Sequence, residues 1–323
     1  MSERQRVAAI DCGTNSIRLL IADLAPGAEG APTLTDVQRS MRVVRLGQGV
    51  DATGQFDPTA LRRTLEAATD YAQACREADV ESVRFIATSA TRDASNAAEF
   101  IDGVHDIFGE FNVTPEVITG EQEAGFSFAG VTAELARADE AYAPYLVVDI
   151  GGGSSEFVRG NSDVEQAISV DIGCVRMTER HLRGDPPTED QVWAALADIT
   201  EAVDHASKAV DFTGISTLIG VAGSVTTTTA HALALPSYLP ERIHGAVIDV
   251  PDVVAATNDL LRLTRAERAA LPFMHPGRVD VMGAGALIWR TVVQRVVRDS
   301  GITTARTSEH DILDGIAWSQ AQA

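Results

Sequence analysis

Alternating apolar and polar positions occur at two places along the chain, and each time they surround a glycine-bearing turn. Residues 5–11 and 16–24 predict a β-hairpin near the N-terminus. Residues 145–149 and 155–159 predict a second strand–turn–strand unit in the second half of the chain. Strand and helix patterns alternate after each unit, so the sequence predicts a duplicated α/β architecture.

The remaining periodicities give the other expected elements. Asp57 and Pro58 form a cap and a first helical position, and apolar residues with helical spacing follow them. The alanine- and acid-rich stretch before Pro144 is the candidate boundary between the halves. Strands are expected at 34–46, 83–87, 113–118, 164–171, 216–221 and 302–304, and further helices at 93–108, 121–136, 188–210, 251–262, 276–297 and 309–320.

Length and composition favour two globular domains. The chain has 323 residues, of which 45% are hydrophobic, enough for two cores. It contains no run of about 18 uncharged apolar residues and no apolar signal segment after its charged N-terminus, so we expect a soluble, cytoplasmic protein. The three cysteines are widely spaced, which favours buried thiols over disulfides or a zinc site.

The charge balance narrows the possible partners. A net charge of −20 argues against a broad nucleic-acid-binding surface or an anionic membrane as partner, because both require a basic footprint. A small anionic substrate remains compatible, since binding responds to local potential. Lys208 is the only lysine, so nearly all positive charge is arginine, which suits forked recognition of phosphate oxygens.

The pattern D-x-G-x-x-S begins at Asp11 and again at Asp149. Glycine loops expose backbone N–H groups, which bind phosphate without a large positive charge. The first loop is also compatible with a tight hairpin turn in which Gly13 and Asn15 take positive φ. The second loop has three consecutive glycines, whose entropic cost an ordinary turn does not require. Asp149 and Glu156 flank it and are candidate Mg²⁺ ligands, or else caps or solvated charges.

Three further segments follow predicted strands and open helices. Residues 88–93 combine hydroxyls, Arg92 and a helix start, suited to an anion or to ordinary capping by Asp93. Residues 119–124 carry glutamates that suit either a general base or the helix dipole. Residues 220–224 form either an anion nest or a plain connection.

Other motifs narrow the choice of chemistry. No P-loop pattern is present, and the seven histidines lack metal-binding spacing, so a P-loop NTPase and a histidine metal site are not expected. Arg39, Arg42 and Arg45 lie in a predicted strand, with Arg39 and Arg45 on one face. They suit either a polyphosphate track or the balancing of acidic neighbours, and we favour the second.

Taken together, these motifs resemble the exopolyphosphatase and guanosine pentaphosphate phosphatase (Ppx/GppA) family. The resemblance runs in order over essentially the whole chain. It rests on AAIDCGTNSIRLLIA (8–22), IATSATRDASN (86–96), ITGEQEAGFSFAGV (118–131), LVVDIGGGSSEFVRG (146–160), DIGCVRMTE (171–179) and PGRVDVMGAGALI (276–288).

The resemblance implies an α/β fold of duplicated actin-like ATPase (ribonuclease H-like) type, with two lobes and an interdomain cleft. The family belongs to the actin-like, sugar-kinase-like and heat-shock-protein-like ATPase superfamily. The N-terminal lobe is then expected at 1–130, completed by a C-terminal helix at 307–323, and the second lobe at 131–306. Longer relatives carry a C-terminal HD-type domain, whereas this chain resembles the short, two-domain members.

The resemblance also assigns site residues. Glu123 matches the family's catalytic glutamate, and Gln122 replaces the first glutamate of its G-x-E-E-A motif. Asp149 matches the essential aspartate and, with Glu156 and Asp11, the expected set of Mg²⁺ ligands, which Mn²⁺ would also suit. The expected phosphate-binding residues are Gly13, Thr14, Asn15, Ser16, Arg92, Gly151, Gly152, Gly153, Ser154, Gly223 and Ser224.

The expected function is exopolyphosphatase activity, in which Glu123 activates water for attack on the terminal phosphoanhydride of inorganic polyphosphate. One alternative is hydrolysis of pppGpp to ppGpp, which would connect the protein to the stringent response. A kinase or ATPase of the same superfamily and a non-hydrolytic sensor of polyphosphate or alarmone are also compatible with the motifs. A homodimer is expected as well.

Overall fold

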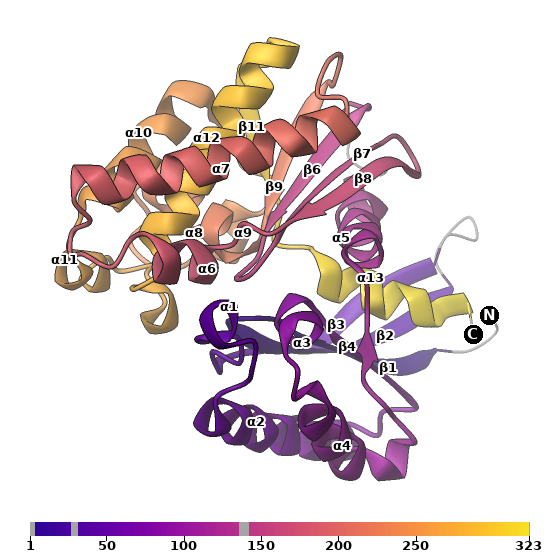
Figure 1. Ribbon diagram of the computed structural model, residues 1–323. Helices are drawn as coiled ribbons and strands as arrows, with labels where there is room; N and C mark the ends of the chain where they lie inside the picture. The colour runs from indigo at the N-terminus through magenta and orange to yellow at the C-terminus, as the bar shows by residue number, and fades with distance from the viewer. Residues whose placement is uncertain (1–3, 27–31, 136–141, 323) are drawn as a thin grey trace. The chain divides into compact units, whose positions relative to one another are not determined.

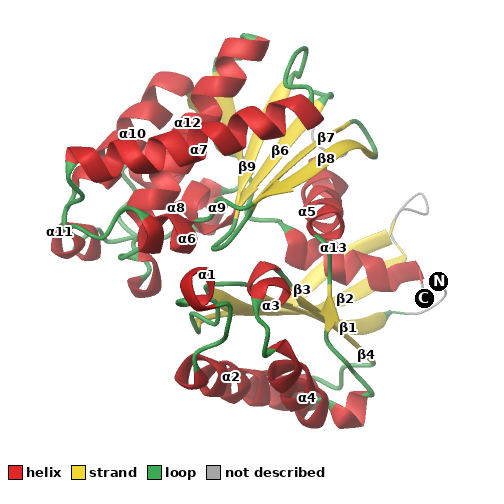
Figure 2. Ribbon diagram, viewed as in Figure 1, coloured by secondary structure: helices red, strands yellow, loops and turns green. Residues whose placement is uncertain are grey.

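The computed structural model describes residues 4–26, 32–135 and 142–322, and the chain divides into two compact units. Unit 1 comprises residues 1–130 and 312–323, and unit 2 comprises residues 131–311. Each unit contains one β-sheet, and helices pack on both sheets (Figures 1 and 2). The stretch before Pro144 expected as a boundary falls mainly on residues 136–141, outside the described part of the chain.

Unit 1 has a five-stranded sheet in the order β3-β2-β1-β4-β5. The first three strands are antiparallel neighbours, and β4 and β5 run parallel to β1. The strands are β1 (Gln5–Cys12), β2 (Ser16–Pro26), β3 (Pro32–Val43), β4 (Ser82–Ala87) and β5 (Glu116–Val117). The helices are α1 (Val50–Thr53), α2 (Pro58–Glu77), α3 (Ser89–Asp93), α4 (Ala97–Ile107), the 3-10 turn η2 (Gly109–Phe111), α5 (Gly120–Leu135), α13 (Ile312–Trp318) and the 3-10 turn η4 (Ser319–Gln322).

The two faces of the unit 1 sheet are covered by different helices. Successive residues of a strand point to opposite faces, and Ala8 and Ile10 pack in one buried cluster with apolar residues of α2 and α4. Val7 and Ala9 pack in another with α13. The C-terminal segment therefore completes the core of the N-terminal unit.

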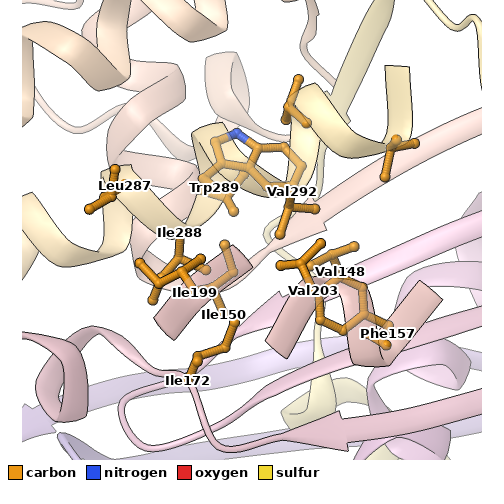
Figure 3. Close-up of a cluster of buried hydrophobic side chains, with 14 of the residues drawn as sticks. Val148, Ile150, Phe157, Ile172, Ile199, Val203, Leu287, Ile288, Trp289 and Val292 are labelled. Atoms are coloured by element: carbon orange, nitrogen blue, oxygen red, sulfur yellow. The ribbon is translucent and has the colours of Figure 1, made fainter. Parts of the chain in front are cut away.

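Unit 2 has a six-stranded sheet in the order β10-β11-β9-β6-β7-β8. Its core joins β6 and β7 to α7 and α12, with Phe157 and Trp289 among the buried side chains (Figure 3). The strands are β6 (Tyr145–Ile150), β7 (Ser155–Gly160), β8 (Val164–Val170), β9 (Thr217–Val221), β10 (Val247–Asp249) and β11 (Thr304–Thr307). The helices are α6 (Cys174–Arg180), α7 (Glu189–Ala209), α8 (Ala222–Ala232), α9 (Pro240–Ile243), α10 (Val250–Arg262), α11 (Arg265–Ala269), the 3-10 turn η3 (Pro276–Arg278) and α12 (Met282–Ser300).

The two sheets repeat one topology. Strands β8, β7 and β6 are antiparallel like β3, β2 and β1, and β9 and β11 follow in parallel like β4 and β5. The predicted α/β class and its duplication are confirmed. The C-terminal helix expected over 307–323 begins later, because Thr307 is the last residue of β11 in unit 2 and α13 begins at Ile312.

Several element boundaries differ from those expected. The helix predicted over 93–108 begins only at Ala97 as α4, and Asp93 instead ends the separate helix α3. The predicted strand 113–118 is reduced to two residues, and α6 was not predicted. Strand β3 ends at Val43, so Arg45 lies outside it with φ 52°. The cap at Asp57 is as expected, with Asp57 accepting from the N–H groups of the next turn, and the helix expected from about residue 188 is capped by Thr188.

Candidate active site

The first glycine loop joins β1 to β2 and is closed by a hydrogen bond from the Gly13 N–H to the Ser16 carbonyl, at 3.0 Å. The carbonyls of Thr14 and Asn15 accept hydrogen bonds from segment 44–47. In the described part of the chain, the N–H groups of Thr14 and Asn15 donate to no acceptor. The expected positive φ at Gly13 and Asn15 is wrong, because segment 44–47 satisfies the carbonyls and the loop does not need a reversed backbone.

Asp11, at the end of β1, is held by an arginine. Asp11 lies opposite Arg18 in the β1–β2 register, and the Arg18 Nε and Nη2 atoms donate to Asp11 Oδ2 at 2.9 and 2.7 Å. This ion pair is mostly buried. A metal bound directly by Asp11 would therefore compete with a guanidinium for Oδ2.

Arg92 and Glu123 meet beside the parallel strand ends of unit 1. The Arg92 Nη1 atom donates to Glu123 Oε2 at 2.9 Å and to the Ile118 carbonyl at 2.8 Å. The Glu123 side chain is 12% exposed. Ends of parallel strands commonly carry ligand sites in α/β folds. The structure thus brings together two predicted site residues that are far apart in the sequence.

The first turn of α5 distinguishes the acidic residues near its start. Gln122 N–H donates to the Thr119 hydroxyl, and the Thr119 N–H donates to Gln122 Oε1, which is a reciprocal capping box. Glu121 and Gln122 are exposed, whereas Glu123 faces Arg92. The glutamine that replaces the family's first glutamate therefore has a local structural role, and Glu123 is the carboxylate positioned at Arg92.

The second glycine loop joins β6 to β7 and repeats the hydrogen bond of the first. Gly151 N–H donates to the Ser154 carbonyl at 3.0 Å. The carbonyls of Gly151 and Gly152 accept from the first N–H groups of α6, and Gly153 accepts from Arg176 Nε at 2.8 Å. Within the described residues, the N–H groups of Gly152, Gly153 and Ser154 have no acceptor. This arrangement leaves several adjacent donors for an anion.

Gly173, just before α6, allows that close packing. A Cβ atom at this position would overlap the Gly152 carbonyl and the Gly153 nitrogen. The backbone of the loop is the obstacle, so a side chain could be accommodated only by moving the loop. Gly173 lies in the segment DIGCVRMTE, but nothing in its local pattern distinguishes it from a turn glycine.

Asp149 and Glu156 form a pair of carboxylates in unit 2. They are opposite each other in the β6–β7 register, so their side chains lie on the same face of the sheet. Their exposed fractions are 7% and 1%, and Glu156 Oε1 accepts from the hydroxyls of Ser154 and Ser169 at 2.7 Å. The Ser154 hydroxyl is therefore directed at Glu156, and its N–H remains for phosphate.

This pair fits Mg²⁺ chemically. Two neighbouring buried carboxylates repel each other, and a divalent cation that prefers oxygen ligands would offset that repulsion. Mg²⁺ usually takes only one or two protein carboxylates and keeps several waters. Among the residues that the structure describes, no group of three or more His, Cys, Asp or Glu side chains that could hold a metal ion occurs.

The start of α8 departs in part from the expected anion nest. The Ser224 hydroxyl packs against Gly285 of α12, so the side chain points into the protein. Burial raises the pKa of the adjacent Cys174 thiol, against the opposing effects of a Ser224 hydrogen bond and the charge of Arg278. Gly223 lies against the Arg278 guanidinium, which a Cβ atom would overlap. Arg278 is thus a cation at this helix start that the sequence interpretation missed.

Arg39 and Arg42, two of the three arginines considered for a polyphosphate track, balance acidic neighbours, which is the alternative that we favoured from the sequence. Arg39 pairs with Asp36 and Asp314, and Arg42 pairs with Asp70.

All three cysteines are buried and unbridged. Among the described residues, no helix has both the length and the apolar character needed to span a bilayer.

Comparison with known proteins identifies the family. The model of the Ppx/GppA phosphatase family matches residues 20–320. The chain belongs to this family. Exopolyphosphatase 2 of Mycobacterium tuberculosis is 47% identical over 319 residues, covering 98% of both chains. A guanosine-5'-triphosphate,3'-diphosphate pyrophosphatase of Photobacterium profundum is 32% identical over 219 residues, which cover 68% of this chain and 42% of that protein.

Solved structures of Ppx/GppA proteins have the same fold. An exopolyphosphatase-like protein is 45% identical with a TM-score of 0.92, covering 98% of this chain and 99% of that one. An exopolyphosphatase from Cytophaga hutchinsonii is 26% identical with a TM-score of 0.85, covering 98% of both chains. The resemblance noted in the sequence motifs is therefore confirmed for the family and the fold.

Proposed function

We propose that this protein is an exopolyphosphatase that hydrolyses the terminal phosphoanhydride of inorganic polyphosphate and releases orthophosphate. The similarity that carries the proposal extends over 98% of this chain and 98% of exopolyphosphatase 2 at 47% identity. The two glycine loops with unpaired N–H groups and the Arg92–Glu123 pair support phosphate chemistry.

In the proposed reaction, Glu123 acts as the general base. It removes a proton from a water molecule as the water oxygen bonds to the terminal phosphorus and the bridging P–O bond breaks. Arg92, already hydrogen-bonded to Glu123, holds the carboxylate in place and adds positive charge near the phosphoryl oxygens. Loop N–H groups bind the phosphate chain and require no lysine.

Asp149 and Glu156 are the proposed holders of Mg²⁺, or of Mn²⁺. When bound, the metal would neutralise charge on phosphate oxygens. Asp11, the third expected ligand, is paired with Arg18, and we propose that it orders the first loop through that pair. Polyphosphate as substrate, a homodimer and a cytoplasmic location are likewise proposals.

The alternative substrate is pppGpp, with a role in the stringent response. Relatives named for that activity match a smaller part of the chain at lower identity. Hydrolysis of either substrate breaks the same type of bond, so the choice depends on contacts beyond the reacting phosphate.

The test compares phosphate release from polyphosphates of graded length, pppGpp and ATP, with and without Mg²⁺. We expect polyphosphate to be the preferred substrate and Mg²⁺ to be required. The variant Glu123→Gln should lose about 10²–10⁴-fold in kcat and keep polyphosphate binding. Preference for pppGpp by orders of magnitude would reject the first choice of substrate. Near wild-type turnover in Glu123→Gln would reject the assignment of Glu123 as the general base.

A further inference from the structure

The C-terminal helix α13 contacts the helix that carries Glu123 through a glycine. Gly315 of α13 lies against the backbone of Phe126 in α5, where a Cβ atom would overlap the Phe126 carbonyl oxygen. The two helices lie close together in Figure 1. Because the obstacle is backbone, any side chain at 315 requires one of the helices to move.

We call α13 and the following turn η4 the C-terminal platform. The platform also holds the side chain of Phe126, through Arg84. The Arg84 guanidinium carbon lies 4.9 Å from the centre of the Phe126 ring. Arg84 Nη1 also donates to the hydroxyl of Ser319, which follows α13, at 2.7 Å. Phe126 thus contacts the C-terminal segment through both its backbone and its ring-bound arginine.

The platform is itself fixed to the sheet of unit 1 by buried polar contacts. Asp314 is fully buried, and Arg39 of β3 donates to it through two nitrogens, at 2.5 and 3.2 Å. Gln320 Nε2 donates to the Ala8 carbonyl of β1 at 3.1 Å. The apolar residues of α13 pack in one cluster with β1, β2 and Phe126. The C-terminal segment is therefore anchored at both ends.

A displacement of Phe126 would also displace Glu123, the proposed general base, because both residues belong to α5. Phe126 follows Glu123 by three residues, so the two lie on neighbouring positions of one helix face. Glu123 is aligned by Arg92, which also binds the Ile118 carbonyl just before α5. A shift of α5 relative to α13 would change the distance between Glu123 and Arg92.

We propose that α13 positions the catalytic base, with Gly315 and Arg84 as positioning residues that fix Phe126 and hence Glu123. This inference rests on the proposed function of Glu123. The C-terminal residues then determine where the base stands, although they touch no reacting atom.

The first test is Gly315→Ala in the full-length chain. We expect kcat on polyphosphate to fall about 10–100-fold, since misplacement of about 1 Å has effects of this size, while KM changes less than about 2-fold. Gly109→Ala is the matched control because no atom lies within 4 Å of a Cβ at that position. It should keep wild-type kcat.

Arg84→Gln and a double variant separate positioning from folding. Arg84→Gln removes the contact with the Phe126 ring together with the hydrogen bonds from Arg84 to Ser319 and Glu116, and we expect a smaller fall in kcat, about 2–5-fold, again at constant KM. Adding Gly315→Ala to Glu123→Gln should not lower the residual rate further, because the displaced group is already inactive.

The outcomes distinguish this inference from the function on which it rests. Wild-type kcat in a folded Gly315→Ala variant, or a further loss of activity in the double variant, would overturn the proposal that α13 positions Glu123. If Gly315→Ala does not fold, a wild-type kcat in Arg84→Gln would overturn it instead. Absence of phosphate release by the wild-type chain, or full turnover by Glu123→Gln, would reject the proposed function itself.

Discussion

The two glycine loops occupy equivalent places in the two units but differ in the residue opposite the aspartate. In unit 1, Asp11 faces Arg18 and forms an ion pair with it. In unit 2, Asp149 faces Glu156 at the same register position. One exchange of charge therefore separates a neutralised aspartate from a carboxylate pair that suits a divalent cation.

The loops also differ in what supports them. In unit 1 the loop carbonyls bind segment 44–47, which is held in turn by Arg63 through the Val44 carbonyl. In unit 2 they bind the start of helix α6, against which Gly173 is packed. Both loops thus share the turn and the N–H groups that have no acceptor among the described residues, while their surroundings differ: an arginine pairs with the aspartate of the first loop, and a second carboxylate lies opposite that of the second.

The largest expected effect comes from introducing into unit 2 the aspartate–arginine ion pair that Asp11 and Arg18 form in unit 1. Glu156→Arg places a guanidinium opposite Asp149, where it should form the ion pair seen at Asp11 and remove the site proposed for Mg²⁺. We expect kcat to fall at least about 10²–10³-fold, the scale of losing a main charge-stabilising group. Phosphate release and Mg²⁺ binding by calorimetry measure the effect.

Glu201→Arg makes the same charge change on the exposed face of α7 and serves as the control. It should leave kcat and Mg²⁺ binding unchanged. A folded Glu156→Arg variant with the wild-type Mg²⁺ response would show that the carboxylate pair does not hold the metal.

A glycine in each support tests whether the two loops differ in rigidity. A methyl group at Gly173 meets the backbone of the second loop, whereas one at Gly47 meets only side-chain atoms, those of Thr14 and Ala90, among its nearest neighbours. We expect Gly173→Ala to lower kcat/KM about 10–100-fold and Gly47→Ala less than about 5-fold. Steady-state kinetics on polyphosphate measure both. Equal losses would mean that the two supports are equally rigid.

The supports should also respond differently to pH. Asp198 of α7 accepts hydrogen bonds from Arg180 and His181 at the end of α6, at 2.7 and 2.9 Å. Burial raises the pKa of Asp198, but the hydrogen bonds and charges of His181 and Arg180 outweigh it and leave the pKa below its ordinary value of 3.8. The ionised form therefore stabilises the fold above that value, and the contribution is lost as pH falls through the lower, folded pKa.

We expect Asp198→Asn to lower the free energy of unfolding by about 0.5–1 kcal/mol at neutral pH, because the pair is partly exposed. The difference from wild type should shrink as the pH falls below 3.8 and through the lower, folded pKa of Asp198. Urea unfolding across this range measures it. Arg63→Gln in unit 1 removes a bond to a carbonyl, which does not titrate, so its effect should be independent of pH. A pH-independent effect of Asp198→Asn, together with a pH-dependent effect of Arg63→Gln, would contradict the assignment of the titrating support to unit 2.

The smallest expected effect concerns the turns after the equivalent strands β4 and β9. In unit 2, Ala222 has φ 64°, a left-handed conformation unfavourable for alanine, whereas Thr88 in unit 1 has φ −119°. Ala222→Gly should raise the free energy of unfolding by about 0.5 kcal/mol, the strain relieved less the entropy added to the unfolded chain. Ala90→Gly, within α3, should lower it by about 1 kcal/mol. Denaturant unfolding checks both, and a loss at both positions would show that Ala222 is not strained.

Much of the site was predictable because its parts are local. The cap at Asp57, the strands before both loops and the start of the helix near residue 120 depend on neighbours in sequence. Prediction failed for the short helices α3 and α6, which are too short to show a periodicity; α6 begins where its first N–H groups donate to the second loop.

One missed residue, Arg18, left a signal in the sequence. It stands at the same place after Asp11 as the predicted Glu156 does after Asp149, so comparing the two halves position by position would have revealed the difference in charge. Arg278 and Gly173 left no such signal, since their partners lie far away in the chain. The inward direction of the Ser224 side chain likewise depends on Gly285 of another helix.

Periodicity, backbone preference and motif order are enough to predict the duplicated strands, the two D-x-G-x-x-S turns and the resemblance to the Ppx/GppA family. Three contacts follow instead from the packing of the folded chain: Glu123 with Arg92, α6 with the second loop, and Gly315 with the helix that carries Glu123. The reason is that these contacts join segments far apart in the chain, whose meeting depends on how whole helices pack on the sheets.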